Sequence, residues 1–425
     1  MINELITAGK TRGYDIEVYN ILDNTLEIST LNDELTNFNI SNNNNYAIKA
    51  IRNGKCIKLY TGVIDIDNIL NSLDEIYLYQ ENDTENEFST NDFLGREDIN
   101  ESIDIPKIKE DLLSLNNLRS KYKELVSIET TFCRESRKYE IINGKHTMQE
   151  AKQLFDFETA ITVKNASQTK IAYISSPTTD YDFSAFLSLV EERVVLLIKK
   201  LESKSLKTDR YKIVLRNNVV NSIMKAMQNM FFAKSIYLKE SILQDSFDKN
   251  VFSKLINIVE DPKNKNYIGY RSFDDEGTLT TYKDIVKDGK FILKLNNIEY
   301  SKKLGENPTG NSYGIRNMYI KPGKKTFDEL LLKMHDGIII DEVYGTHAGI
   351  NQKTGTISLQ AEGFTIKNGK IDKPLNMIIL STDIKELLNN VIEIGNDLKF
   401  FDEQMGMPSL LIDNITVAGR SDSDE

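Results

Sequence analysis

The chain has 425 residues, 40% hydrophobic and 28% charged; it can therefore bury a sizeable core, and its length predicts two core-forming domains. The net charge is −11 and Lys and Arg form no block, which argues against a nucleic-acid partner. The start of the chain is acidic where a secretion signal is basic, and no apolar run approaches the ~20 residues of a membrane span, so we expect a cytoplasmic protein without membrane contact.

Residues 1–207 are predicted to form an α+β domain. Asn53-Gly54 fits a type I′ turn, in which both central residues need positive φ. The polar stretch 81–104 predicts a solvated loop. The other expected elements are a helix from Pro106 to about Leu125, strand pairs near Ser127–Ile142 and Phe157–Ile174, and a helix from Phe183 to Leu201.

Residues 208–425 are predicted to form a mostly antiparallel β domain. It begins with a short strand, Tyr211–Leu215, and a helix over Asn217–Lys234 with its apolar residues on one face. The remaining signals are turn pairs at Asp288-Gly289, Asp336-Gly337 and Asn368-Gly369, a capping-box helix at Thr326–Leu330 and a helix at Asp383–Val391.

The residues alone predict no catalytic constellation. A zinc hydrolase needs several converging imidazoles or thiolates, whereas His146, His335 and His347 show no ligand spacing. Cys56 and Cys133 have no second Cys or His nearby and are expected to be structural. Nucleophile elbows and phosphate-binding loops are absent from the sequence.

Seven segments in the second half resemble, in order and spacing, the C-terminal region of the TldD/PmbA family of metallopeptidases. They cover roughly half of the chain, between about Ile213 and Gly419. The segments are 273–277, 284–289, 308–311, 345–351, 358–364, 366–371 and 413–419.

The resemblance also implies what is missing. TldD-type members carry His-Glu-x-x-x-His on the first helix of this region and a cysteine near the C-terminus. The corresponding helix here has Lys225, Ala226 and Met230 at those positions, and no cysteine lies near Met407. The chain is thus similar to the PmbA (TldE) branch, which implies that it binds no metal itself and that a TldD-type partner carries the zinc. The partner would be that homologue in a heterodimer or higher assembly, or a second copy of this chain.

The resemblance implies an enclosed chamber for unfolded peptides. The substrate-binding candidates are Thr309, Gly310, Asn311, Thr346, His347 and Gly349. Two bland interpretations stay open: His347 as a turn residue with a local hydrogen bond, and Thr309–Asn311 as a tight loop. We interpret Asp274-Asp275-Glu276-Gly277 as a solvated turn, and Thr356–Thr365 as a strand edge that receives a peptide.

Two alternative functions stay open. One is a stand-alone homodimer that binds or sequesters peptides without hydrolysis. The other is a hydrolase with a carboxylate-rich site.

Overall fold

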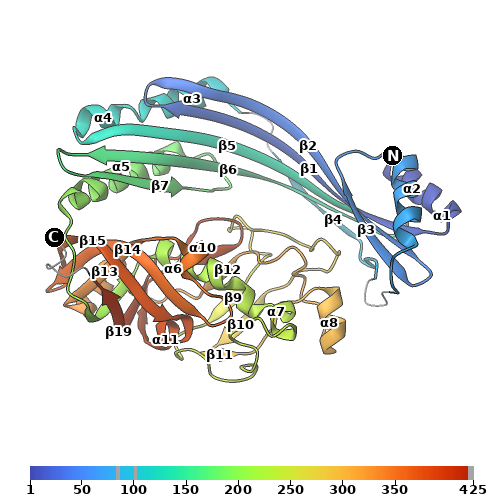
Figure 1. The fold of residues 1–425 in the computed structure, drawn as a ribbon. Coiled ribbons are helices and arrows are strands. Elements are labelled where there is room, and N and C mark those ends of the chain that lie inside the picture. The colour runs from blue at the N-terminus through green and yellow to red at the C-terminus, as the bar shows by residue number, and fades with distance from the viewer. Residues whose placement is uncertain (83–86, 100–102, 420–425) are drawn as a thin grey trace.

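The computed structural model describes residues 1–82, 87–99 and 103–419. One large sheet of the N-terminal half arches over two sheets of the C-terminal half (Figure 1). The predicted α+β class, with a mostly antiparallel second half, is confirmed. No helix of the described residues is long and apolar enough to cross a membrane.

The N-terminal sheet has the strand order β3-β2-β1-β5-β6-β4, and β7 pairs with the far part of β6. Asn53 and Gly54 join β2 to β3 with φ of 49° and 76°, as predicted. The strands are β1 (Asp15–Leu31), β2 (Glu34–Arg52), β3 (Lys55–Thr61), β4 (Phe93–Asp98), β5 (Leu125–Ile142), β6 (Thr147–Lys164) and β7 (Thr169–Ser175). The helices are α1 (Ile2–Thr11), α2 (Ile66–Tyr77), α3 (Ile105–Ser114), α4 (Asn117–Lys121) and α5 (Phe183–Lys199).

Three N-terminal predictions need correction. The stretch 81–104 contains β4, which pairs in parallel with β6; residues 83–86 and 100–102 lie outside the described part. The helix predicted to reach Leu125 ends at Ser114 and is followed by the short α4. Strand β6 begins at Thr147 rather than about Phe157. Its first part was missed because Glu150 and Lys152 look solvent-facing, yet both are buried in ion pairs.

In the C-terminal half, β15-β14-β13-β8-β19 form a sheet that closes on itself, because β15 also pairs with β19. The second sheet has the order β11-β10-β9-β12-β18-β17. The strands are β8 (Asp209–Leu215), β9 (Ile258–Glu260), β10 (Lys283–Lys287), β11 (Lys290–Phe291), β12 (Met318–Ile320), β13 (Gly337–Tyr344), β14 (Thr356–Lys367), β15 (Lys370–Asp383), β16 (Val391–Ile394), β17 (Lys399–Phe400), β18 (Met405–Met407) and β19 (Leu410–Ala418). The helices are α6 (Asn217–Met227), α7 (Ala233–Tyr237), α8 (Ile298–Leu304), α9 (Phe327–Met334), α10 (Thr346–Gly349) and α11 (Ile384–Asn389).

Several local predictions here are confirmed. Thr326 and Glu329 form the capping box of α9, and Asp383 caps α11. The pairs Asp288-Gly289 and Asn368-Gly369 make hairpin turns with positive φ at both residues. Asp336-Gly337 is not such a turn: it links α9 to β13, and His335 takes the positive φ of 66°.

Helix α6 is shorter than predicted. It ends at Met227 instead of continuing to Lys234, and a 3₁₀ turn covers Gln228–Phe231. The cause is tertiary, since Leu295 accepts a hydrogen bond from Ala233 N and donates one to Phe231 O. These bonds draw the backbone into a strand-like bridge beside Phe232 and end the helix.

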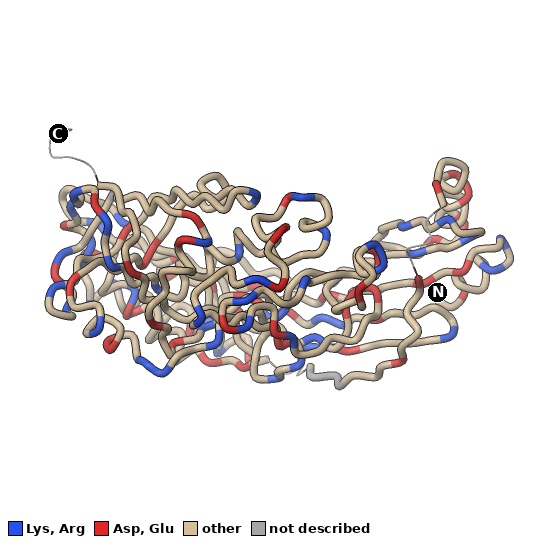
Figure 2. Tube along the Cα trace, turned by 90° about the horizontal axis from the view of Figure 1, so that it is seen from below, with Lys and Arg blue, Asp and Glu red and all other residues tan. Residues whose placement is uncertain are grey.

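The two halves meet at α5, where Arg193 pairs with Glu342 of β13, and at the N-terminal sheet, where Glu150 of β6 pairs with Arg271 (Figure 1). Lys200, directly after α5, forms a buried ion pair with Asp341 of β13, with 2.7 Å between Nζ and Oδ1. Acidic and basic residues are interspersed along the whole trace (Figure 2). The division at residues 207 and 208 stays a prediction; it falls between α5 and β8.

Candidate functional site

Helix α6 and the short α10 enclose a cavity of about 340 Å³. Lys225 and Ala226 line it from α6, and Thr346 and His347 line it from α10. The structure thus brings together the degenerate motif positions and part of the predicted substrate-binding set. The other lining residues are Ser222, Ile350 and Gln352.

The residues of this cavity do not fit a zinc ion. Lys225 forms an ion pair with Asp402, so its ammonium group has no lone pair to offer and its charge repels a cation. Ala226 has no donor atom, and Met230 lies in the core, 1% exposed. Strand β18, near which the resemblance would put the third ligand, packs against α6 with its methionines buried. In the described ranges, no group of three or more His, Cys, Asp or Glu is arranged to hold a metal.

Helix α10 is held close to β14 by a glycine. A Cβ on Gly349 would lie 2.3 Å from the carbonyl oxygen of Ser358, so only glycine allows this approach. The contact fixes the exposed His347 at the wall of the cavity. The other histidines lie elsewhere, where His146 contacts Asp92 and His335 contacts Asp336.

The predicted residues Thr309, Gly310 and Asn311 do not line this cavity. Thr309 exchanges hydrogen bonds with Asn296, including one of 2.8 Å from its backbone N–H to Asn296 Oδ1. Asn311 is 3% exposed and donates to Glu260 Oε1 at 2.8 Å. Gly310 is buried between them. This environment favours the tight-loop interpretation of the three residues.

Asp274, Glu276 and Gly277 are buried and Asp275 is half-buried, contrary to the predicted solvated turn. Asp274 accepts hydrogen bonds from the backbone of Glu276, Thr278 and Ser312, and burial raises the pKa of its carboxyl to about 6. Glu276 is 8% exposed and accepts a hydrogen bond from the first residue of α8. The turn is buried because it inserts against the N-terminal half: Asn91 Nδ2 donates to Gly277 O at 2.9 Å.

The predicted peptide-receiving edge is wrong. Strand β14 is interior, since it pairs with β13 and β15, so Thr356–Thr365 is not a free edge. Glu260 pairs with Lys283 and accepts a hydrogen bond from Asn311, and Asp274 accepts one from the backbone of Ser312. Cys56 and Cys133 do not form a disulfide, and burial raises the pKa of Cys133 to about 12.

A buried cluster of ion pairs joins the two halves, and it was not predicted from the sequence. Arg271 is 1% exposed, pairs with Glu150 of β6 at 2.9 Å, and stacks over the ring of Tyr139 with 3.4 Å from Cζ to the centroid. Glu403 binds Lys152 of β6 together with Arg137 and Arg316. Burial and the neighbouring arginines lower the pKa of Lys152. The charged residues of this cluster come from segments far apart in the sequence, so no local sequence pattern predicts it.

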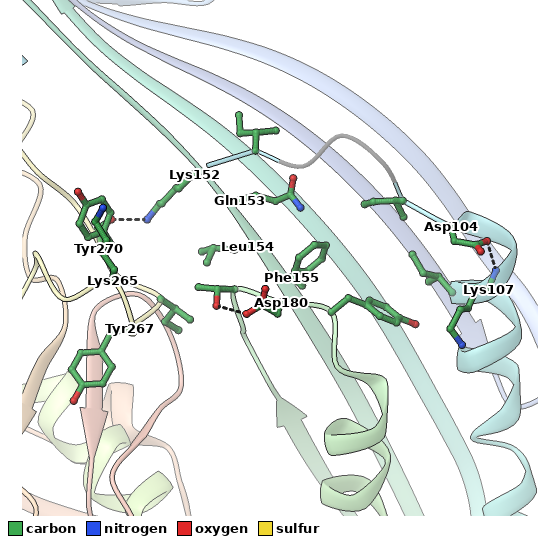
Figure 3. Close-up of a pocket in the computed structure, with 16 residues that line it drawn as sticks. Asp104, Lys107, Lys152, Gln153, Leu154, Phe155, Asp180, Lys265, Tyr267 and Tyr270 are labelled. Carbon is green, nitrogen blue, oxygen red and sulfur yellow. Dashed lines mark hydrogen bonds between the residues drawn. The ribbon is translucent and has the colours of Figure 1, made fainter. Parts of the chain in front are cut away.

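A cavity of about 660 Å³ opens beside this junction (Figure 3). Lys152, Gln153 and Phe155 line it from β6, and Asp104 and Lys107 line it from α3. On the opposite side lie Lys265, Tyr267 and Tyr270 from a loop of the C-terminal half. Lys152 Nζ reaches Tyr270 O at 3.5 Å across it. The cavity therefore lies at the seam, apart from the pocket at α6.

Comparison with known proteins finds a family match in the C-terminal half. Residues 208–419 match the family model of the PmbA/TldA metallopeptidase C-terminal domain. A metalloprotease PmbA homolog of Buchnera aphidicola (subsp. Acyrthosiphon pisum) is 30% identical over 223 residues, which are 52% of this chain and 49% of that protein. The chain thus spans about half the length of the curated relatives it matches.

The fold is shared over nearly the whole chain. A putative modulator of a DNA gyrase from Thermotoga maritima superposes with a TM-score of 0.89 at 22% identity, covering 98% of this chain and 99% of that one. TldE from Thermococcus kodakarensis gives a TM-score of 0.86 at 16% identity, covering 98% and 100%. At these identities the likeness shows the fold alone.

Proposed function

Because this chain belongs to the TldD/PmbA family of metallopeptidases, we propose that it is the non-catalytic PmbA (TldE)-type subunit of a cytoplasmic peptidase for unfolded peptides. A TldD-type homologue supplies the zinc ion, and the two chains form a heterodimer or a higher assembly. This chain contributes a peptide-contacting wall that includes Thr346 and His347.

One observation carries the proposal: a lysine paired with Asp402 stands where the resemblance expects the first zinc ligand. A zinc hydrolase needs neutral donors that hold the ion and acidify its water. Lys225 provides a positive charge instead, and Ala226 provides no general base. The chain has a cavity at this position but lacks the groups for metal chemistry, and this combination supports the role of a structural partner.

The assembly part of the proposal is supported by an open sheet edge. Strand β3 pairs only with the last part of β2, Tyr46–Arg52. The outer edge of Glu34–Asn45 faces no strand of the described residues, and Phe38 and Ile40 on it are 43% and 59% exposed. Unpaired edges with apolar side chains are sites of association. The same edge supports the alternative, a homodimer that binds peptides without hydrolysis, because one edge can pair with its own copy about a two-fold axis.

Co-expression with a TldD-type homologue tests the proposal. We expect co-elution in size-exclusion chromatography, and chelator-sensitive cleavage of unstructured peptides only by the pair. The isolated chain should contain no stoichiometric zinc by mass spectrometry. Chelator-sensitive turnover by the isolated chain would overturn the non-catalytic assignment. Peptide binding by a self-associated chain that ignores the homologue would favour the homodimer.

A further inference from the structure

A cavity of about 340 Å³ lies between the two halves at the start of α6. Its N-terminal wall comes from β7 and α5, and its C-terminal wall comes from the start of α6, from α9 and from β17. It is close to the candidate site: Asn218 lines this cavity, Ser222 lines the other, and Ser222 Oγ donates to Asn218 O at 2.9 Å.

Lys399, Arg216 and Arg193 bring positive charge to this cavity. Arg193 is compensated by Asp341 and Glu342 of β13. Arg216 reaches only Glu192, with 3.9 Å between Nη1 and Oε1, and the Glu192 side chain is 61% exposed. Within the described ranges, Lys399 has no carboxylate at ion-pair distance and only faces the ring of Phe401. Asp397 also lines the cavity, but its two carboxylate oxygens accept hydrogen bonds from the backbone N–H and the hydroxyl of Ser409. Of the three cations, Lys399 is the one that has no carboxylate at ion-pair distance among the described residues.

The positive groups of this cavity disfavour one another's charge. Burial lowers the pKa of Lys399, Glu192 partly opposes this, and Arg193 adds to the lowering. Burial likewise lowers the pKa of Arg193, to which Arg216 contributes. An anion between these groups would relieve their mutual repulsion in a partly desolvated space.

The rest of the lining determines what kind of anion fits. Ile174, Leu189 and Leu196 give the cavity an apolar wall. The backbone N–H of Asn217 is already bonded to Ser409 Oγ, so the start of the helix offers no free donor there. A ligand with one negative group and an apolar body matches both parts of the wall.

We propose that this cavity binds an α-carboxylate next to an apolar side chain, as at the C-terminus of a peptide or in a free hydrophobic amino acid. Binding of a peptide C-terminus, as opposed to a free amino acid, rests on the proposed function. It sets the direction in which the peptide substrate lies along the site. From Asn218 to Lys225, α6 rises by about 10 Å, the length of roughly three extended residues. The C-terminal residue lies between Lys399 and Arg216, and the preceding residues follow the polar face of α6 towards His347.

The test uses fluorescence anisotropy of the full-length chain with an N-terminally labelled peptide that ends in leucine. The free acid should bind about tenfold or more tightly than the C-terminal amide, because a charged hydrogen-bonded contact is lost. Lys399→Gln should weaken binding of the acid by a similar factor and leave the amide unchanged. Lys399→Arg should restore the preference for the acid. Lys370→Gln, a change at an exposed lysine of β15, is the matched control.

Competition separates the two sources of the carboxylate. Free leucine that displaces the peptide, with leucinamide inactive, assigns the site to amino acids; displacement only by peptide acids assigns it to a peptide C-terminus. Equal affinity for acid and amide, or an equal loss for both in Lys399→Gln with an unchanged thermal melt, overturns the inference. Co-elution of Lys399→Gln with the TldD-type homologue is measured separately. If the natural chain does not co-elute with the homologue but still binds the peptide acid more tightly than the amide, only the proposed function is overturned.

Discussion

The N-terminal and C-terminal halves deal with the edges of their sheets in opposite ways. In the C-terminal half, β15 pairs with β19 and closes the sheet, so its interior strands have no free edge. In the N-terminal half, β2 keeps an uncovered edge over Glu34–Asn45. The half that matches the family model in sequence has one closed sheet, while the N-terminal half carries the uncovered edge. Chemistry and association should therefore respond to changes in different halves.

The largest effect is expected where the halves meet. Glu150→Gln removes the nearer of the two carboxylates that pair with the buried Arg271 and leaves only Asp275, 3.4 Å away. This change should lower the free energy of unfolding by about 3–5 kcal/mol. Urea denaturation measures the loss. The control, Asp74→Asn, removes a half-exposed carboxylate that pairs with Arg12 and Arg52 and accepts a hydrogen bond from Tyr14. This loss should cost at most about 1 kcal/mol. Similar small losses in both variants would mean that the junction does not hold the halves together.

The second effect concerns α6 and the 3₁₀ turn after it, where the zinc motif of TldD-type proteins would lie. Lys225→His, Ala226→Glu and Met230→His together should cost about 3–4 kcal/mol, since Met230 is buried in the core and a polar ring would replace it. Zinc binding should be weak and peptidase activity absent, because the 3₁₀ turn after Met227 disrupts the helical spacing and no third ligand exists. A zinc titration, a cleavage assay and a thermal melt measure this. The double variant without Met230→His should melt like the natural chain.

Robust activity of that triple variant would contradict the dedicated-partner assignment. It would show that the chain is an enzyme in which only the metal site was lost.

The third effect is a pH dependence with opposite signs in the two halves. The pKa of Asp274 is raised to about 6 by burial, so its stabilising contribution is present below its unfolded pKa and is lost as pH rises through 6. Relative to Asp274→Asn, the natural chain should lose about 2–3 kcal/mol between pH 4 and 7. Backbone hydrogen bonds lower the pKa of Asp182, the N-cap of α5, so the difference between the natural chain and Asp182→Asn should grow with pH. Urea unfolding midpoints of the natural chain and both variants at pH 4 and 7 measure these differences. An equal change with pH in the natural chain and Asp274→Asn would contradict the prediction for Asp274.

The smallest effect on stability is expected at the open edge of β2, where a substitution should instead weaken assembly. Ile40→Lys places a charge on the open edge of β2 and should change the unfolding free energy by only about 0.5 kcal/mol. Sedimentation should nevertheless show weaker association, since a charged edge disfavours strand pairing. Leu332→Lys, an exposed leucine on α9, is the control in the closed half. Unchanged association in Ile40→Lys would remove this edge from the assembly.

Local backbone chemistry explains which parts of the fold could be predicted. The turns at Asn53-Gly54 and Asn368-Gly369 require positive φ, and the capping box at Thr326 needs only residues one turn away. The closure between β15 and β19 joins segments without any shared local pattern. The start of β6 was missed because its charges are neutralised by residues more than a hundred positions away, such as Arg271 opposite Glu150.

The candidate site also has a part that could be predicted from the sequence and a part that could not. Family motifs led to Lys225, Ala226, Thr346 and His347, which do line one cavity. The same reasoning grouped Thr309–Asn311 with them, although these residues bond to Asn296 and Glu260 instead. The cationic cavity around Lys399 had no motif, because its walls come from α5, α6 and β17 and exist only after the halves have met.

Strand β19 also sets an order of events during synthesis. It pairs with β8, β15 and β16, so these strands keep open edges until Leu410–Ala418 has left the ribosome. One late segment thus protects several earlier ones from pairing with other chains. A message truncated before this strand yields a product with more exposed strand edges than any point substitution creates, and such products are natural targets for chaperones and quality-control proteases.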